Sequence, residues 1–226
     1  DMLKVASSIT KLSPNAQESV LNFLATNNTT AAIPVVEKSL KSLKSAESKI
    51  AAYKTLAALT KGENAEFLIS QLATATPAEE SALKSLLATA KGANTVNAIN
   101  TALVGSNEKT QLALLSVLGM RSNASSANKV FDLLPNASPA VRLAAIKALP
   151  AVSTDGDLDK IIELLGKAQG EELSYLQRAA ILALQNNPQK EQKVSRLAAN
   201  ISRSLAPSSA NYFPIFAGEG SATSLA

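Results

Sequence analysis

The sequence predicts an all-α protein built as a solenoid of about six stacked helix pairs. Three observations predict this fold: a nearly all-apolar helix recurs along the chain, an amphipathic helix separates its copies, and cap residues followed by proline mark helix starts. Of the 226 residues, 46% are hydrophobic but only 4% are aromatic. Ala, Leu, Ser and Lys dominate this composition, which favours helix over strand.

The clearest copy of the apolar helix is residues 138–152, SPAVRLAAIKALPAV. Ser138 can cap this helix and Pro139 fits its first turn. From Val141 to Leu149 only Arg142 and Lys147 are polar, so the helix needs neighbours on most of its surface. Related segments end in equivalent leucines: Leu24, Leu56, Leu86, Leu118, Leu149 and Leu184. Their intervals of 32, 30, 32, 31 and 35 residues predict repeats that cover one another.

Each repeat is expected to hold a second, amphipathic helix, because apolar residues recur there at intervals of three and four. These segments are residues 31–43, 64–73, 95–104, 127–134, 158–168 and 190–205. Thr76 and Glu79 form a predicted capping box at one helix start. Lys61-Gly62 and Lys91-Gly92 are predicted helix ends, with glycine at a left-handed position. Pro150 is expected to kink or end its helix.

The repeats predict the domain organisation. Residues 1–205 are expected to form the solenoid, and residues 2–12 have the pattern of a second helix from an earlier repeat. The six repeats are residues 13–44, 45–75, 76–105, 106–136, 137–170 and 171–205. Residues 206–226 are expected to form an irregular tail or linker, with aromatic residues around Tyr212 docking on the last repeat. We also expect the chain to be part of a longer multidomain protein.

The fifth repeat carries a motif that resembles the first helix of a HEAT-like repeat, of the short, PBS-lyase type. The motif is Pro139-Ala140-Val141-Arg142, followed by Ala144, Ala145, Ala148 and Leu149. The resemblance extends over roughly residues 13–205 and implies a right-handed solenoid whose second helices line a concave face. Ser138 stands where the family usually has Asp, and Gln111 and Gln177 replace Arg142 in two other repeats. These departures argue against a ladder of Arg–Asp pairs between repeats.

The composition excludes several kinds of site. The chain has no Cys and no His, which excludes disulfides, thiolate metal sites and Ser-His-Asp triads. No apolar run approaches the roughly 18 residues of a membrane span. The net charge of +4 is compatible with nucleic acid binding but does not indicate it. The absence of Cys slightly favours an extracytoplasmic location, periplasmic or secreted.

Five basic residues are the candidate partner-binding residues: Lys38, Lys41, Lys44, Arg142 and Arg178. The three lysines lie three residues apart, on one face of a predicted second helix at the groove or its rim. They can be interpreted as a phosphate-binding stripe. A solvated face is the favoured interpretation, because neither arginine nor an aromatic residue for base stacking accompanies them.

Acidic clusters are interpreted as helix-start chemistry. Asp155, Asp157 and Asp159 alternate like the first ligands of a calcium loop, but Lys160 and Gly166 stand where Gly and Glu are required. Carboxylates in a first helical turn are favoured by the helix dipole, which explains these residues without a metal.

The same interpretation applies to the acidic pairs Glu79-Glu80 and Glu171-Glu172. We therefore expect no catalytic residue, no cofactor and no metal site, and a protein that is not an enzyme. The leading interpretation is a non-catalytic scaffold or spacer that holds a protein or peptide on its concave face. One alternative is a nucleic-acid-binding solenoid with a lysine-rich groove. Another is an accessory domain of a secreted carbohydrate-acting enzyme.

Overall fold

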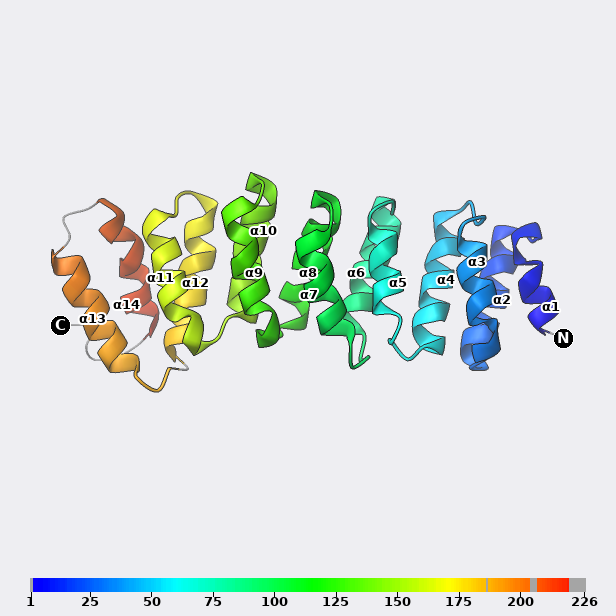
Figure 1. Cartoon of the computed structure of the whole chain (residues 1–226), viewed down its shortest axis with the longest axis horizontal. Coiled ribbons are helices and arrows are strands. Elements are labelled where there is room, and N and C mark those ends of the chain that lie inside the picture. The colour runs from blue at the N-terminus through cyan, green and yellow to red at the C-terminus, as the bar shows by residue number, and fades with distance from the viewer. Residues whose placement is uncertain (1, 186, 204–206, 220–226) are drawn as a thin grey trace. The chain divides into compact units, whose positions relative to one another are not determined.

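The computed structural model describes residues 2–185, 187–203 and 207–219 (Figure 1). Across these ranges it contains fourteen α-helices, six short 3-10 helices and no strand. The predicted all-α solenoid class is therefore confirmed. The chain divides into two compact units, Asp1–Val117 and Leu118–Ala226, with the boundary inside helix α8, Glu108–Arg121.

Unit one alternates first and second helices as predicted. Its first helices are α2 (Pro14–Thr26), α4 (Ala46–Leu59), α6 (Pro77–Thr89) and the start of α8. Its second helices are α1 (Met2–Ser7), α3 (Ile33–Leu40), α5 (Ala65–Leu72) and α7 (Thr95–Gly105). Helix α4 packs between α2 and α6, α1 packs on α3, and α5 packs on α7. In this unit first helices therefore pack on first helices, and second helices pack on second helices in the pairs α1–α3 and α5–α7.

Unit two repeats the arrangement. Its second helices are α9 (Ala127–Leu133), α11 (Leu158–Lys167) and α13 (Lys190–Arg203). Its first helices are α10 (Pro139–Val152), α12 (Glu171–Gln185) and α14 (Phe213–Glu219). Helix α12 packs against α10, α11 and α14. The 3-10 turns Ala124–Ser126 and Asp155–Asp157 lead into α9 and α11, and Thr30–Ala32 leads into α3 in unit one.

Five first helices share one register between a cap and a buried leucine. The caps are Ser13, Ser45, Thr76, Asn107 and Ser138, whose side-chain oxygens accept a backbone N–H three residues later at 3.0–3.4 Å. The leucine 11 residues after each cap is fully buried: Leu24, Leu56, Leu87, Leu118 and Leu149. This register corrects the predicted Leu86, which is only half-buried. The predicted capping box of Thr76 and Glu79 is confirmed.

The loops after α4 and α6 contact each other through glycine. Gly62 has a φ of 84°, as predicted for a helix end, but Gly92 does not have a positive φ. Gly92 is required for a different reason, since a Cβ there would overlap the Gly62 carbonyl. The Thr95 hydroxyl donates to the Gly62 carbonyl at 3.4 Å, and the Ala93 N–H donates to the Glu63 carboxylate at 3.0 Å.

Pro150 does not end its helix, because α10 continues to Val152. A proline this close to a helix end removes one intrahelical hydrogen bond and leaves few turns to distort. Pro34, for comparison, occupies the first turn of α3, where no N–H partner is needed. Leu205, the last residue of the predicted 190–205 helix, lies outside the described residues.

The expectation of an irregular tail is wrong for residues 207–219. They form the 3-10 helix Pro207–Tyr212 and helix α14, which packs on α12. The Asn211 amide donates to the carbonyls of Leu165 and Ala168 at 3.0 and 3.2 Å, and Ile215 is fully buried. The Tyr212 hydroxyl donates to the Ile162 carbonyl at 3.4 Å, so this aromatic residue docks on the fifth repeat and not on the last repeat as expected. Buried apolar area and satisfied carbonyls explain why this segment is ordered.

Candidate functional site

A groove of about 400 Å³ lies between α1 and α3 in unit one. Its apolar lining residues are Ala6, Ile9, Pro34 and Val35. Its polar lining residues are Ser7, Thr10, Lys38, Ser39 and Ser42. A concave surface with apolar walls and a few polar groups is the usual form of a binding site.

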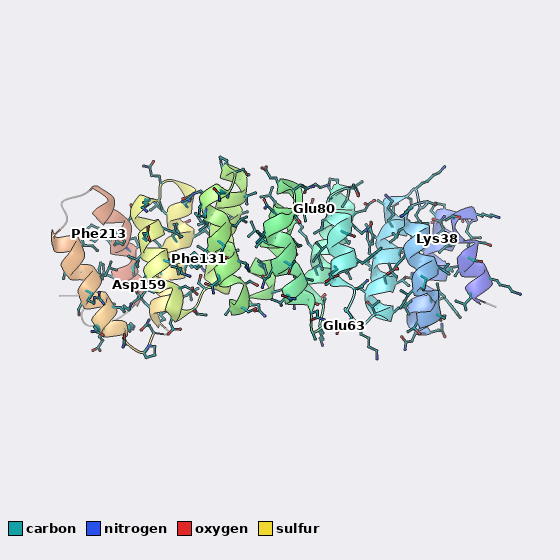
Figure 2. The ribbon with its side chains drawn as sticks, in the orientation of Figure 1. Lys38, Glu63, Glu80, Phe131, Asp159 and Phe213 are labelled. Carbon is teal, nitrogen blue, oxygen red and sulfur yellow. The ribbon has the colours of Figure 1, made fainter. Side chains whose placement is uncertain are left out.

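The sequence of α3 determines which side chains line this groove. Val36 and Leu40, four residues apart, are buried and anchor the helix to the core. Val35 and Lys38 lie on the side that faces α1, and Figure 2 shows Lys38 projecting from the α3 ribbon.

Part of the polar lining is already used within the helices. The Ser7 hydroxyl donates to the Lys4 carbonyl and the Ser39 hydroxyl to the Val36 carbonyl, both at 2.7 Å. Thr10, Lys38 and Ser42 make no side-chain hydrogen bond with a described residue. They are therefore the donors that the groove can offer to a ligand.

The groove lies in a basic part of the chain. Lysines outnumber acids on α1, on the 3-10 turn Ile9–Lys11, on α3 and in the turn that follows. The lysines are Lys4, Lys11, Lys38, Lys41 and Lys44, and the single acid is Glu37. None of these lysines makes an ion pair within the described part of the chain. Their charge remains available to an acidic partner.

The second helices of unit two differ, because several of their cations have partners. Lys160 donates to the Asn128 amide oxygen at 3.0 Å and lies 5.0 Å from the centre of the Phe131 ring. Lys193 donates to both carboxylate oxygens of Asp159 at 2.9 Å. Lysines without an ion pair are therefore concentrated on α1, α3 and the adjoining turns, although Arg196 on α13 also has no ion pair with a described residue.

The structure separates the five predicted partner-binding residues. Only Lys38 lines the groove. Helix α3 ends at Leu40, so Lys41 and Lys44 do not share a helix face with Lys38, and that part of the prediction is wrong. The chain leaves the helix there because Leu43 turns inward and is buried, with 3% of its surface exposed.

Arg142 and Arg178 both lie in unit two. The Arg142 guanidinium donates to both carboxylate oxygens of Glu172, Nε at 2.8 Å and Nη2 at 3.0 Å. This bidentate pair holds α10 to α12, so Arg142 has a structural partner. Arg178 is exposed on α12 and makes no ion pair with any residue described.

Ion pairs between repeats exist, but those described here are not the Arg–Asp pairs of the family pattern. Lys49 of α4 lies 3.3 Å from Glu79 of α6, and Arg142 pairs with Glu172. Both acids are first-turn glutamates, whereas the family pattern has an aspartate before the proline. Burial and the charge of Glu79 raise the pKa of the neighbouring Tyr53 to about 12.

The calcium-like acids have separate partners. Asp157 accepts hydrogen bonds from the Thr154 N–H and hydroxyl, both at 2.9 Å, in a capping box. Asp159 pairs with Lys193, as described above. Among the described residues no three metal-ligating side chains come together. Within the same described ranges, no helix combines the length and the hydropathy needed to span a lipid bilayer.

Sequence reasoning missed most of the groove residues. Ile9, Pro34 and Val35 become neighbours only because α1 packs on α3. The sequence offered one signal, the apolar Val35 directly after Pro34. Val35 is half-exposed and lies outside the buried stripe of Val36 and Leu40, so it has no apolar partner in its own helix pair.

Comparison with known proteins gives a family match that runs from α7 to α12. Residues 97–185 match a family model described as HEAT repeats. This span begins within α7 and ends with α12. No curated protein and no solved structure matches the chain.

Proposed function

We propose that this chain, whose residues 97–185 match a model described as HEAT repeats, binds an acidic, partly apolar segment of a partner protein in the groove between α1 and α3 of its first unit. Helical repeats of this kind stack into extended surfaces that serve protein interaction. The observation that carries the proposal is Lys38, an exposed cation without an ion pair, standing at the wall of an apolar groove.

The groove suits a segment with both apolar and acidic side chains. Its volume of about 400 Å³ lies in the range of roughly 300–1,000 Å³ that is usual for ligand sites. Ile9 and Val35 would pack against an apolar side chain, while Lys38 would pair with a carboxylate next to it. Lys41 and Lys44 in the following turn add long-range attraction for negative charge.

The same groove is less suited to binding a nucleic acid. The groove lining contains no aromatic side chain and no arginine, so bases would have nothing to stack on. The role is a binding role rather than a catalytic one, since no acid–base pair or activated nucleophile lines the groove.

The test is a binding titration by fluorescence anisotropy. The probes are a labelled ten-residue peptide of alternating Asp and Leu, the same peptide with Lys in place of Asp, and a single-stranded oligonucleotide. We expect the acidic peptide to bind and Lys38→Glu to weaken it about tenfold, which corresponds to about 1.4 kcal/mol.

The matched control is Lys54→Glu, which makes the same charge change at an exposed lysine on α4 away from the groove. It is expected to change affinity less than twofold. Equal losses for the two variants would overturn the groove assignment, and preferential binding of the oligonucleotide would support the nucleic-acid interpretation.

A further inference from the structure

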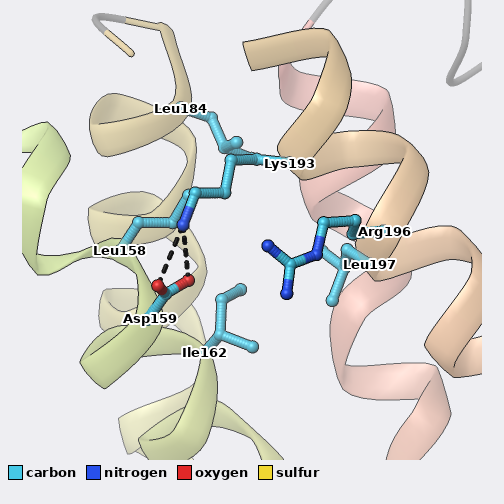
Figure 3. Close-up of a pocket in the computed structure, with 7 residues that line it drawn as sticks. All are labelled: Leu158, Asp159, Ile162, Leu184, Lys193, Arg196 and Leu197. Atoms are coloured by element: carbon cyan, nitrogen blue, oxygen red, sulfur yellow. Dashed lines mark hydrogen bonds and ion pairs between the residues drawn. The ribbon is translucent and has the colours of Figure 1, made fainter. Parts of the chain in front are cut away.

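A separate pocket of about 90 Å³ lies in unit two, between α11, α12 and α13 (Figure 3). Its apolar walls are Leu158, Ile162, Leu184 and Leu197. Leu158 and Leu184 form the buried floor, with 3% and 1% of their surfaces exposed. Two cations and one anion complete the lining: Lys193, Arg196 and Asp159.

Of the three charged residues at the mouth of the pocket, Arg196 is the one without a partner among the described residues. Lys193 and Asp159 neutralise each other through two contacts of 2.9 Å. Arg196 lies one turn further along α13 and has no ion pair or hydrogen bond with any described residue. Figure 3 shows its guanidinium reaching from α13 toward the side of the pocket where Asp159 and Ile162 of α11 lie.

The other acid of α11, Glu163, has a partner of its own. Glu163 pairs with Lys167 on its own helix at 2.9 Å, and this contact lowers the pKa of Glu163. The mouth of the pocket therefore carries a net positive charge, presented by a planar group that binds carboxylates through two parallel hydrogen bonds.

The size of the pocket limits the apolar part of a ligand. An apolar cavity of about 150 Å³ admits benzene, and this pocket is smaller. A branched aliphatic group therefore fits better than an aromatic ring. We propose that this pocket binds a branched aliphatic carboxylate, with the alkyl group against Leu158 and Leu184 and the carboxylate on Arg196.

Two sources supply this chemistry: a free branched-chain carboxylate, or the chain-terminal leucine or valine of a protein. The probes are N-acetyl-L-leucine, its amide, N-acetyl-L-phenylalanine, and a ten-residue peptide with a C-terminal leucine. We expect N-acetyl-L-leucine to bind with a Kd on the order of 1 mM, and to shift the methyl NMR signals of Leu158, Ile162 and Leu184.

The amide and the phenylalanine compound are expected to bind at least tenfold more weakly. A peptide that binds at least tenfold tighter than N-acetyl-L-leucine identifies the source as a chain terminus, and equal affinities identify a free carboxylate. Both results support the chemistry of the site. Equal binding of acid and amide would overturn it.

The decisive variants are Arg196→Gln and Arg196→Lys. Arg196→Gln is expected to abolish binding, whereas Arg196→Lys keeps the charge without the fork and is expected to retain part of it. Arg178→Gln, at an exposed arginine on α12 outside the pocket, is the control and is expected to bind normally. Circular dichroism verifies that the variants fold, and a loss that is equal in Arg178→Gln would contradict the proposal.

Discussion

Arg142 and Glu172 form a two-pronged ion pair between the first helices of successive repeats, with contacts of 2.8 and 3.0 Å. Both side chains are half-buried, with 32% and 20% of their surfaces exposed. In a double-mutant cycle of Arg142→Ala and Glu172→Ala, measured by urea unfolding, we expect a coupling energy of about 1 kcal/mol.

The neighbouring pair Lys147–Glu171, at 2.7 Å, is the control for this prediction. It joins the same two helices but is largely exposed, and solvent screens such pairs. Lys147→Ala is therefore expected to leave the unfolding midpoint unchanged. A coupling near zero between Arg142 and Glu172 would show that this pair does not hold the repeats together.

Because Gly62 and Gly92 are in close contact, we expect that adding one methyl group at Gly92 lowers the stability of the protein. Gly92→Ala would drive its Cβ into the Gly62 carbonyl, and we expect the free energy of unfolding to fall by about 1–3 kcal/mol. Gly119 lies inside α8 with open space around it, so Gly119→Ala is expected to stabilise the protein by about 0.5–1 kcal/mol. Effects of the same sign and size would refute the close approach of the two loops.

The corrected register of α6 predicts that adjacent leucines differ. Leu87 is fully buried and Leu86 is half-buried. Leu87→Ala is expected to lower the free energy of unfolding by about 2–5 kcal/mol. Leu86→Ala should cost at most about 1 kcal/mol. The opposite order in chemical denaturation would restore the register predicted from sequence.

Two residues of helix α14, Ile215 and Phe213, are expected to differ in how much they contribute to stability. Ile215→Ala removes a fully buried side chain and is expected to destabilise unit two by about 2–4 kcal/mol. Phe213, labelled in Figure 2, is 59% exposed, so Phe213→Ala is expected to have an effect within about 0.5 kcal/mol. Equal stability of both variants would mean that α14 is not docked on α12.

Tyr53 predicts a loss of stability at alkaline pH. Its pKa is raised from 10.0 to about 12 in the folded protein. Between these values the unfolded state has lost the phenolic proton and the folded state still holds it, so stability falls as pH rises from about 10 to 12. Tyr53→Phe should therefore show a shallower fall in melting temperature over this range. Identical profiles for the two proteins would exclude this contribution.

The repeat architecture could be predicted because it depends on local signals. A cap followed 11 residues later by a buried leucine lies within one helix, and the chain displays it five times. The choice between Leu86 and Leu87 could not be made this way, because either leucine fits the apolar pattern until the helix is packed on its neighbours.

The groove and α14 depend on contacts between distant segments. Ile9 and Val35 become neighbours through the packing of α1 on α3, which no interval in the sequence encodes. Helix α14 was missed because its short segment, with Phe213, Pro214 and Gly218, lacks the Ala and Leu of the other first helices. Its order depends on burial of Ile215 and on hydrogen bonds to carbonyls of the preceding repeat.

The most direct test of the proposed role is a methyl NMR titration of the full chain with the Asp-Leu peptide. The account predicts that the methyl signals of Ile9 and Val35 shift together and saturate, while the buried Ile161 of α11 does not move. Shifts that spread without saturation, or that appear at Ile161 and not at Ile9, would contradict binding in the groove between α1 and α3.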